Sequence, residues 1–225
     1  MAGVVLDAGD LLYYRRKDAL SVLAEAVESV TGQHIAFNRR AALLLYELRE
    51  LSYRGMISRR DAVALFLRAL GVEGSLVDEV YARYDREMQE GVVFYDDCVR
   101  AVRELKSLGY RVAVLSNSDF RAEEKLGWFA RAGLDALLDV VVCSCDIGRC
   151  KPEAEAYLYV LGELGVEPGK AAFVGHSVRD LVGAKSVGMV TVAVRCPLSE
   201  IPHVDAVAGS LAELPRVVAS VLPPG

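Results

Sequence analysis

The hydrophobic positions of the chain change their spacing near residue 16 and again near residue 90. Residues 3–6 form a short apolar run that stops at Asp7-Ala8-Gly9-Asp10, a pattern that predicts a buried strand followed by a turn. From 16 to 90 the apolar positions recur at helical spacing, first at Leu20, Leu23, Ala24 and Val27 and then in two further stretches. This middle segment is predicted to be an all-helical insertion.

After residue 93 strand-like and helix-like segments alternate. The apolar runs lie at 111–115, 140–143, 171–174 and 190–194, with helical patterns between them at 100–108, 153–164 and 180–186. Strands that alternate with helices imply right-handed crossovers and a parallel sheet covered on both faces. We therefore predict an α/β fold: a Rossmann-like core from residues 1–15 and 91–225, with a helical bundle from 16–90 inserted after the first strand.

The composition allows a full core and argues against several partners. The chain has 225 residues, 53% of them hydrophobic, and a net charge of -5. Lys and Arg are scattered, so no broad basic surface is predicted for nucleic acid or an anionic membrane. Neither a signal-peptide pattern nor a long apolar run occurs, which predicts a cytoplasmic protein. The scarcity of Asn and Gln indicates a heat-loving source.

Polar residues gather where the predicted strands end. In open parallel sheets the binding crevice lies beyond the carboxyl ends of the strands, so side chains at these positions are candidates for chemistry. They are Asp7, Gly9 and Asp10 after the first strand, Ser116 and Asn117 after another, Lys151 before a helix, and His176, Ser177 and Asp180 after a third strand.

These candidates fall within four short motifs that span nearly the whole chain. The motifs read Val4-Val-Leu-Asp7-Ala-Gly-Asp-Leu-Leu-Tyr13, Val112-Ala-Val-Leu-Ser116-Asn117, Lys151-Pro152 and Phe173-Val-Gly-His-Ser-Val-Arg-Asp180. In this order and at these separations the chain resembles the haloacid dehalogenase-like hydrolases. The resemblance implies a Rossmann-like core and identifies the helical insertion as a cap that closes over the active site and sets substrate choice.

The resemblance also implies roles for the candidate residues. Asp7 would be the covalent nucleophile, because an aspartyl intermediate can be opened by water in a second, easier step. Ser116, Asn117 and Lys151 would bind a small anionic substrate, and Lys151 would offset its charge. Asp180 would complete the catalytic set. A Mg²⁺ ion, if used, would be held by Asp7, the Gly9 carbonyl and Asp180.

Three positions depart from the pattern of the family. Gly9 stands where the phosphatases usually carry an Asp that acts as general acid, and Leu11 replaces the usual Thr or Ser. His176 replaces an Asp that binds Mg²⁺. Asp10 is one residue beyond Gly9 and is expected to point elsewhere unless a distorted turn brings it back. These changes predict weak Mg²⁺ binding or none.

Three functions remain open on the sequence. The first is a small-molecule phosphatase that acts through Asp7 with a weakened metal site. The second is a metal-independent hydrolase of the 2-haloacid dehalogenase type, in which a halide leaves without protonation. The third is a non-catalytic binding or regulatory protein on the same fold. Arginines in and near the insertion could reach an anionic substrate: Arg15, Arg16, Arg39, Arg40 and Arg54. The sequence does not indicate an oligomeric state.

Overall fold

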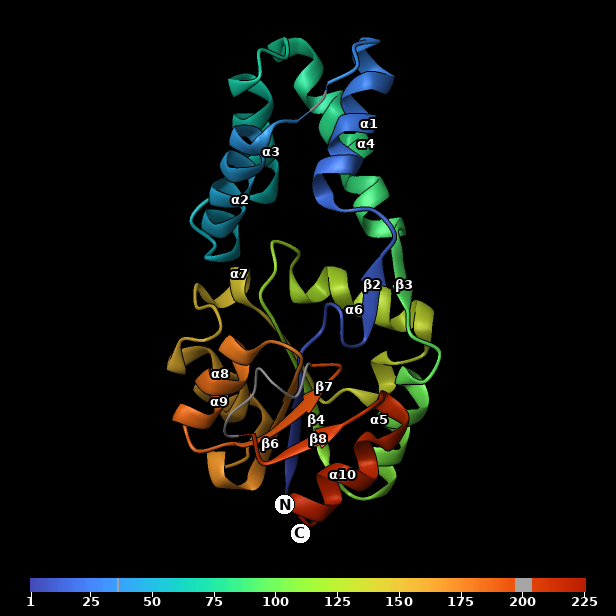
Figure 1. Ribbon diagram of the computed structural model, residues 1–225, viewed down its shortest axis with the longest axis vertical. Helices are drawn as coiled ribbons and strands as arrows, with labels where there is room; N and C mark the ends of the chain where they lie inside the picture. The colour runs from blue at the N-terminus through green and yellow to red at the C-terminus, as the bar shows by residue number, and fades with distance from the viewer. Residues whose placement is uncertain (36, 197–203) are drawn as a thin grey trace.

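A six-stranded parallel sheet forms the centre of the molecule (Figure 1). The computed structural model describes residues 1–35, 37–196 and 204–225. The strand order is β5-β4-β1-β6-β7-β8, and every neighbouring pair is parallel. The strands are β1 (Gly3–Leu6), β4 (Arg111–Ser116), β5 (Val140–Cys143), β6 (Ala171–Gly175), β7 (Val190–Val194) and β8 (Ala206–Ala208).

The central place of β1 explains why its sequence is apolar throughout. All four of its residues are buried, because neighbouring strands and helices cover both of its faces. Leu6 is in register with Val114 of β4 and with Val174 of β6. The carboxyl ends of the three strands therefore lie within two residues of one another, and the residues at and beyond these ends meet at one edge of the sheet.

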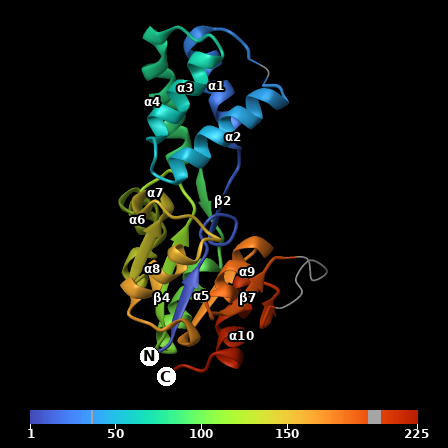
Figure 2. The same cartoon turned by 90° about the vertical axis from the view of Figure 1, so that its left-hand side faces the viewer.

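Two layers of helices cover the sheet, as the alternation in the sequence predicts. Alternate residues of the central strands pack against α5, α6 and α10 on one face and against α8 and α9 on the other (Figure 2). The bounds are α5 (Cys98–Ser107), α6 (Ala122–Ala132), α7 (Ser144–Ile147), α8 (Ala154–Leu164), α9 (Val178–Ser186) and α10 (Leu214–Val221). The fold is the predicted α/β class.

Four helices lie beyond the carboxyl edge of the sheet (Figure 1). They are α1 (Ala19–Thr31), α2 (Arg39–Tyr53), α3 (Arg59–Ala69) and α4 (Val77–Glu90). Asp18, Asn38 and Ser58 cap the first three, each accepting hydrogen bonds from backbone N–H groups that no turn of the helix satisfies. We propose that residues 16–90 are the cap domain, on the boundaries that the hydrophobic spacing predicts.

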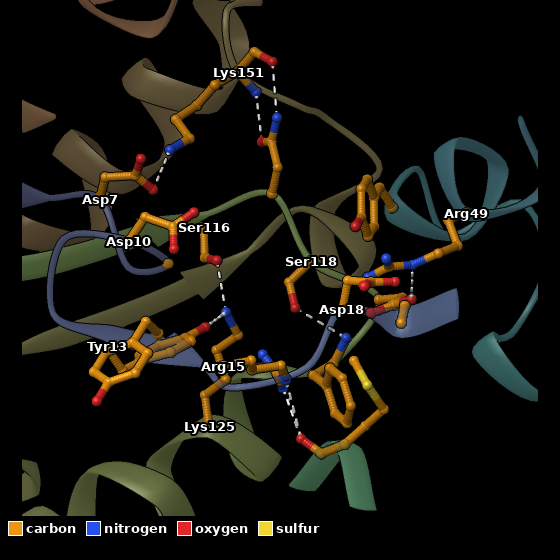
Figure 3. Close-up of a pocket in the computed structure, with 18 of the residues that line it drawn as sticks. Asp7, Asp10, Tyr13, Arg15, Asp18, Arg49, Ser116, Ser118, Lys125 and Lys151 are labelled. Atoms are coloured by element: carbon orange, nitrogen blue, oxygen red, sulfur yellow. Dashed lines mark hydrogen bonds and ion pairs between the residues drawn. The ribbon is translucent and has the colours of Figure 1, made fainter. Parts of the chain in front are cut away.

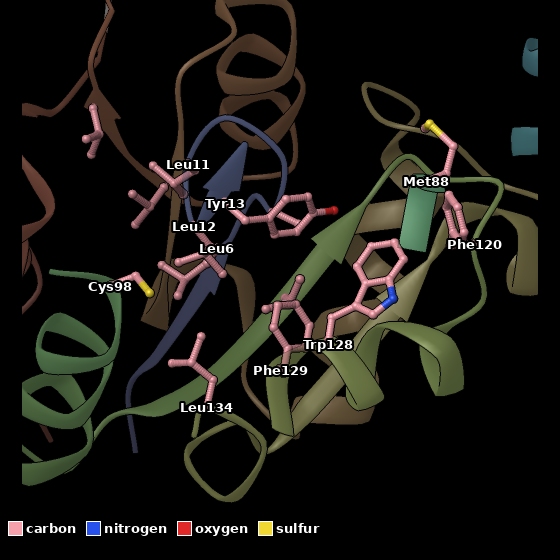
Figure 4. Packing of buried hydrophobic residues seen from close by; sticks show 14 of the residues in the cluster. Leu6, Leu11, Leu12, Tyr13, Met88, Cys98, Phe120, Trp128, Phe129 and Leu134 are labelled. Carbon is pink, nitrogen blue, oxygen red and sulfur yellow. The ribbon is translucent and has the colours of Figure 1, made fainter. Parts of the chain in front are cut away.

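A two-stranded antiparallel ribbon connects these helices to the core. It consists of β2 (Tyr13–Arg15) and β3 (Val92–Phe94), which the hydrophobic pattern does not predict. The Tyr13 ring packs edge-on against Trp128 of α6, with ring centroids 5.8 Å apart (Figure 4). Aromatic contacts of this kind stabilise the position of the ribbon. The ribbon therefore brings Tyr13 and Arg15 against the core.

Among the described residues, no helix has both the length and the apolar character needed to cross a membrane.

Candidate active site

A cavity of about 490 Å³ opens between the carboxyl edge of the sheet and the inserted helices α1, α2 and α4 (Figure 3). All of the predicted catalytic and substrate-binding residues line it, together with Gly9, the predicted contributor of a metal-binding carbonyl. They are Asp7, Ser116, Asn117, Lys151 and Asp180. The shared register of β1, β4 and β6 accounts for this meeting, because each strand delivers its last residue or the next loop to the same edge.

Lys151 joins the two carboxylates of the site. Its Nζ donates to Asp7 Oδ1 at 2.6 Å and lies 3.0 Å from Asp180 Oδ2. The backbone N–H of Ala8 also donates to Asp7 Oδ1, at 2.8 Å. Burial lowers the pKa of Lys151, but the two carboxylates raise it by a larger amount, so the net shift is upward. The ammonium is therefore charged, and it holds Asp7 in one orientation.

Asn117 bonds to the backbone of Lys151. Its Oδ1 accepts from the Lys151 N–H at 2.8 Å, and its Nδ2 donates to the Lys151 carbonyl at 2.9 Å. Arg179 donates to the same carbonyl at 2.9 Å. The carboxamide of Asn117 is thus engaged in placing Lys151. Its predicted role in binding substrate stays a prediction.

Asp180 is fixed by a contact with the neighbouring helix α8. The hydroxyl of Tyr157, a buried residue of α8, donates to the Asp180 carbonyl at 2.7 Å. This contact needs a glycine at position 183, since a Cβ there would lie 2.8 Å from the Tyr157 hydroxyl and 2.7 Å from Pro152 Cβ. Tyr157 is both a core residue and a support for the site.

The turn after β1 has an unusual conformation at Asp10. Its φ is +57°, in the left-handed region that Asp tolerates better than most residues. The side chain is exposed and lines the cavity, and in Figure 3 its carboxylate lies on the side of the cavity that holds Asp7 and Ser116. Asp10 therefore supplies a carboxylate to the lining of the cavity next to Gly9, which has none, and its return to the position of the acid stays a prediction.

His176 lies beside Asp7. Its Nδ1 is 3.5 Å from Asp7 Oδ2 and, among the described residues, has no hydrogen-bond partner. The Asp7 carboxylate thus has Lys151 at one oxygen and His176 at the other.

The donor set does not fit a complete Mg²⁺ site. Mg²⁺ prefers oxygen ligands in octahedral geometry. Asp7 Oδ1 and Asp180 Oδ2 are both engaged by Lys151, and His176 presents a nitrogen close to Asp7. Within the described ranges, no group of three or more His, Cys, Asp or Glu side chains could hold a metal. Metal binding through Asp7, Gly9 and Asp180 stays a prediction, and no step of the chemistry below depends on it.

A second buried lysine was not anticipated. Lys125 Nζ donates to Ser116 Oγ at 2.6 Å and to the Tyr13 hydroxyl at 2.7 Å, and the residue is only 2% exposed (Figure 3). Burial lowers its pKa, but interactions with Tyr13 and Cys143 outweigh that effect, so the net shift is upward. The sequence carried a signal: Lys125 shares the apolar stripe of α6 with Trp128 and Phe129, where a lysine is out of place.

Arginines connect the cap helices to the core. Arg49 of α2 pairs with Asp119 at 3.2 Å. Arg59 of α3 pairs with Glu124 at 2.6 Å and lies 3.7 Å from the centroid of the Phe120 ring. Of the arginines proposed from sequence, Arg15 lines the cavity. Arg54 pairs instead with Glu153 at 2.6 Å, and Arg16, Arg39 and Arg40 are exposed.

Comparison with known proteins agrees with this geometry. The family model described as haloacid dehalogenase-like hydrolase matches residues 1–188. The chain belongs to this family. Its membership and its relatives support a hydrolase over a non-catalytic protein.

The relatives of this haloacid dehalogenase-like hydrolase carry two kinds of chemistry. A glyceraldehyde 3-phosphate phosphatase of Methanopyrus kandleri is 28% identical over 85% of this chain and 83% of that protein. An (S)-2-haloacid dehalogenase 4A of Burkholderia cepacia is 36% identical, over 44% of this chain and 42% of that protein. The solved structure of a 2-haloacid dehalogenase from Pseudomonas syringae superposes with a TM-score of 0.76 at 19% identity, covering 98% of this chain and 99% of that one, which bears on the fold alone.

Proposed function

We propose that the protein hydrolyses phosphate monoesters of small molecules, with Asp7 as the nucleophile. The observation that carries the proposal is the fixed carboxylate of Asp7, held by Lys151 and by the Ala8 N–H at the edge of a cavity lined with cationic side chains. Of the two relatives compared by sequence above, the one that matches the larger share of this chain is named a phosphatase. A small anionic substrate in the cytoplasm is part of the same proposal.

The reaction would proceed in two displacements. Asp7 attacks phosphorus, the bond from phosphorus to the ester oxygen breaks, and the alkoxide takes a proton. Asp10 is our candidate for the acid, because its carboxylate lines the cavity. Water then attacks the phosphorus of the aspartyl phosphate, which releases inorganic phosphate and regenerates Asp7. Lys151 stays protonated throughout and offsets the negative charge that builds up around phosphorus.

A second candidate function is hydrolysis of 2-haloacids without a metal. One observation favours it: Lys151 bonds to both Asp7 and Asp180. Its ammonium could then hold a carboxylate nucleophile in place without a metal ion. A halide also leaves without a proton, so the reaction does not need an acid at position 9. Against it, a haloacid carries one negative charge, whereas two cations of the cavity, Arg15 and Lys125, have no carboxylate partner among the described residues.

The test is a screen of phosphate monoesters and 2-haloacids, each with Mg²⁺ and with a chelator. We expect turnover of phosphate monoesters, with a modest dependence on Mg²⁺, because His176 offers no carboxylate to the ion. The control is Asp7→Asn, which retains the shape of the side chain and lacks the nucleophile. Release of halide in place of phosphate would transfer the assignment to the second function, and no turnover of either class would refute both.

A further inference from the structure

Three hydrogen-bond donors in the cavity have nothing to donate to. Lys125 has no lone pair, so Ser116 Oγ and the Tyr13 hydroxyl must both accept from it. Each hydroxyl therefore has its own proton available. Among the described residues, neither hydroxyl has an acceptor, and the third N–H of Lys125 has none. All three residues line the cavity.

The positive charge of the Lys125 ammonium also has no negative partner among the described residues. No carboxylate in the described part of the chain lies within 4.0 Å of Lys125 Nζ, whereas Lys151 has two. The nearby groups are aromatic: the rings of Tyr13 and Trp128, at 5.4 and 5.6 Å from Nζ. The Arg15 guanidinium lies 5.0 Å from the same Trp128 ring and donates to the Met88 carbonyl. Two cations thus share one region of the cavity.

A buried ammonium without a counter-ion is unfavourable for folding, because two hydrogen bonds and aromatic faces replace only part of its hydration. An anionic ligand would supply both missing elements, the negative charge and the acceptors. The same argument does not apply to Lys151, whose charge Asp7 and Asp180 already balance. The unbalanced charge and the unused hydrogen-bond donors are therefore confined to Lys125 and the two hydroxyls.

We propose that Tyr13, Lys125 and Ser116 bind oxygens of the phosphoryl group of the substrate, which makes Lys125 a further catalytic residue. The proposal rests on the phosphatase function. Three donors match the three non-bridging oxygens of a phosphate monoester, whereas a carboxylate offers two oxygens. When Asp7 attacks phosphorus and the ester bond breaks, the ammonium of Lys125 offsets the charge on those oxygens. Ser116 connects Lys125 to the ligand, because its hydroxyl accepts from Lys125 and donates to the phosphoryl oxygen.

The test measures binding of inorganic phosphate by calorimetry, which needs no turnover. We expect Lys125→Met to weaken phosphate binding at least tenfold and Tyr13→Phe to weaken it severalfold. The matched control is Lys170→Met, because Lys170 is exposed and lies outside the cavity. Unfolding of Lys125→Met without phosphate should begin at the same temperature as in the wild type or higher, since an unpaired buried charge is removed. Phosphate should raise the unfolding temperature of the wild type and leave that of Lys125→Met unchanged.

The outcomes separate the two proposals. If phosphate binding depends on Lys125 but the protein hydrolyses no phosphate ester, the phosphatase function is refuted and the phosphate-binding site is supported. Unchanged phosphate binding in Lys125→Met would overturn the site, whatever the activity. If Lys125→Met does not fold, Tyr13→Phe, which retains the ring, decides in its place. Acetate that binds as tightly as phosphate with the same dependence on Lys125 would also overturn the site, because it would indicate a carboxylate ligand.

Discussion

Asn117 and Lys151 are joined by a pair of hydrogen bonds, in which the Asn117 carboxamide meets both the N–H and the carbonyl of Lys151, at 2.8 and 2.9 Å. The two residues are 34 positions apart in the chain, and they belong to different motifs. The bonds fix the backbone from which the Lys151 side chain reaches Asp7.

Replacement of Asn117 by Ala should therefore lower kcat, because the backbone of Lys151 loses both hydrogen bonds and its side chain shifts relative to Asp7. A displacement of a catalytic group by about 1 Å can reduce the rate on the order of 100-fold, and we expect a loss of that size with a smaller change in KM. Steady-state kinetics on a phosphate monoester measures both. Asn38→Ala is the control, because that side chain caps α2 and should cost about 1 kcal/mol of stability without affecting kcat. Equal losses of kcat in the two variants would contradict the positioning role.

Asp10→Asn should affect esters according to their leaving groups. If Asp10 protonates the departing alkoxide, an alkyl phosphate should lose about 100-fold in kcat, whereas p-nitrophenyl phosphate, whose leaving group needs no acid, should lose little. Asn also tolerates the positive φ of this position, so the turn should be retained. The measurement is the ratio of kcat for the two substrates. A uniform loss would show that Asp10 acts on the structure of the turn and does not act as an acid.

His176→Asp should make the site respond to Mg²⁺. The change adds a carboxylate next to Asp7, and Mg²⁺ prefers oxygen ligands over imidazole nitrogen. We expect Mg²⁺ to bind at least tenfold more tightly and phosphatase activity to rise, as measured by calorimetry and by activity against metal concentration. His34→Asp is the control, because His34 is exposed and lies outside the cavity. Tight Mg²⁺ binding by the unchanged protein would refute the view that His176 deprives the site of a metal ligand.

Lys151→Met should destabilise the fold as well as abolish activity. Removing the ammonium leaves Asp7 and Asp180 buried without a cation, and breaking a buried ion pair in this way costs about 3–5 kcal/mol. Urea unfolding gives the change in the free energy of unfolding. In Lys106→Met the lost pair with Asp139 is partly exposed, so that variant should lose no more than about 1 kcal/mol. A loss of similar size in both variants would count against this view of the Lys151 cluster.

The sequence predicts the sheet and the meeting of the candidate residues because both follow from local patterns. The apolar run before Asp7 and the one before Ser116 are strands in the structure, and parallel topology brings their ends together. The ribbon of Tyr13–Arg15 and Val92–Phe94 escaped prediction, since each strand has three residues and their pairing spans the whole cap. The left-handed conformation of Asp10 goes with a hydrogen bond from its N–H to the carbonyl of Tyr13, the first residue of this ribbon.

Lys125 and Asn117 show why the sequence does not predict the partners of individual side chains. The place of Lys125 on an apolar stripe was a signal of burial, but its partners, Tyr13 and Ser116, come from other segments of the chain. For Asn117 the motif indicates a position near the substrate, yet the partner of its carboxamide is a backbone 34 residues away. Residue type predicts the chemistry that a side chain can perform, and only the fold determines the group that it faces.

The contacts of Arg59 have a consequence for the rate at which the cavity exchanges its contents. Arg59 lies on the Phe120 ring and pairs with Glu124, both in the core, while its own helix belongs to the cap. Any motion that separates α3 from the core must break these contacts together, and a motion of α2 must also break the pair of Arg49 and Asp119. Product release would then be a gated step whose rate depends on contacts between these helices and the core. Because these pairs are largely buried, ionic strength would weaken them, and with them this gate, only slightly.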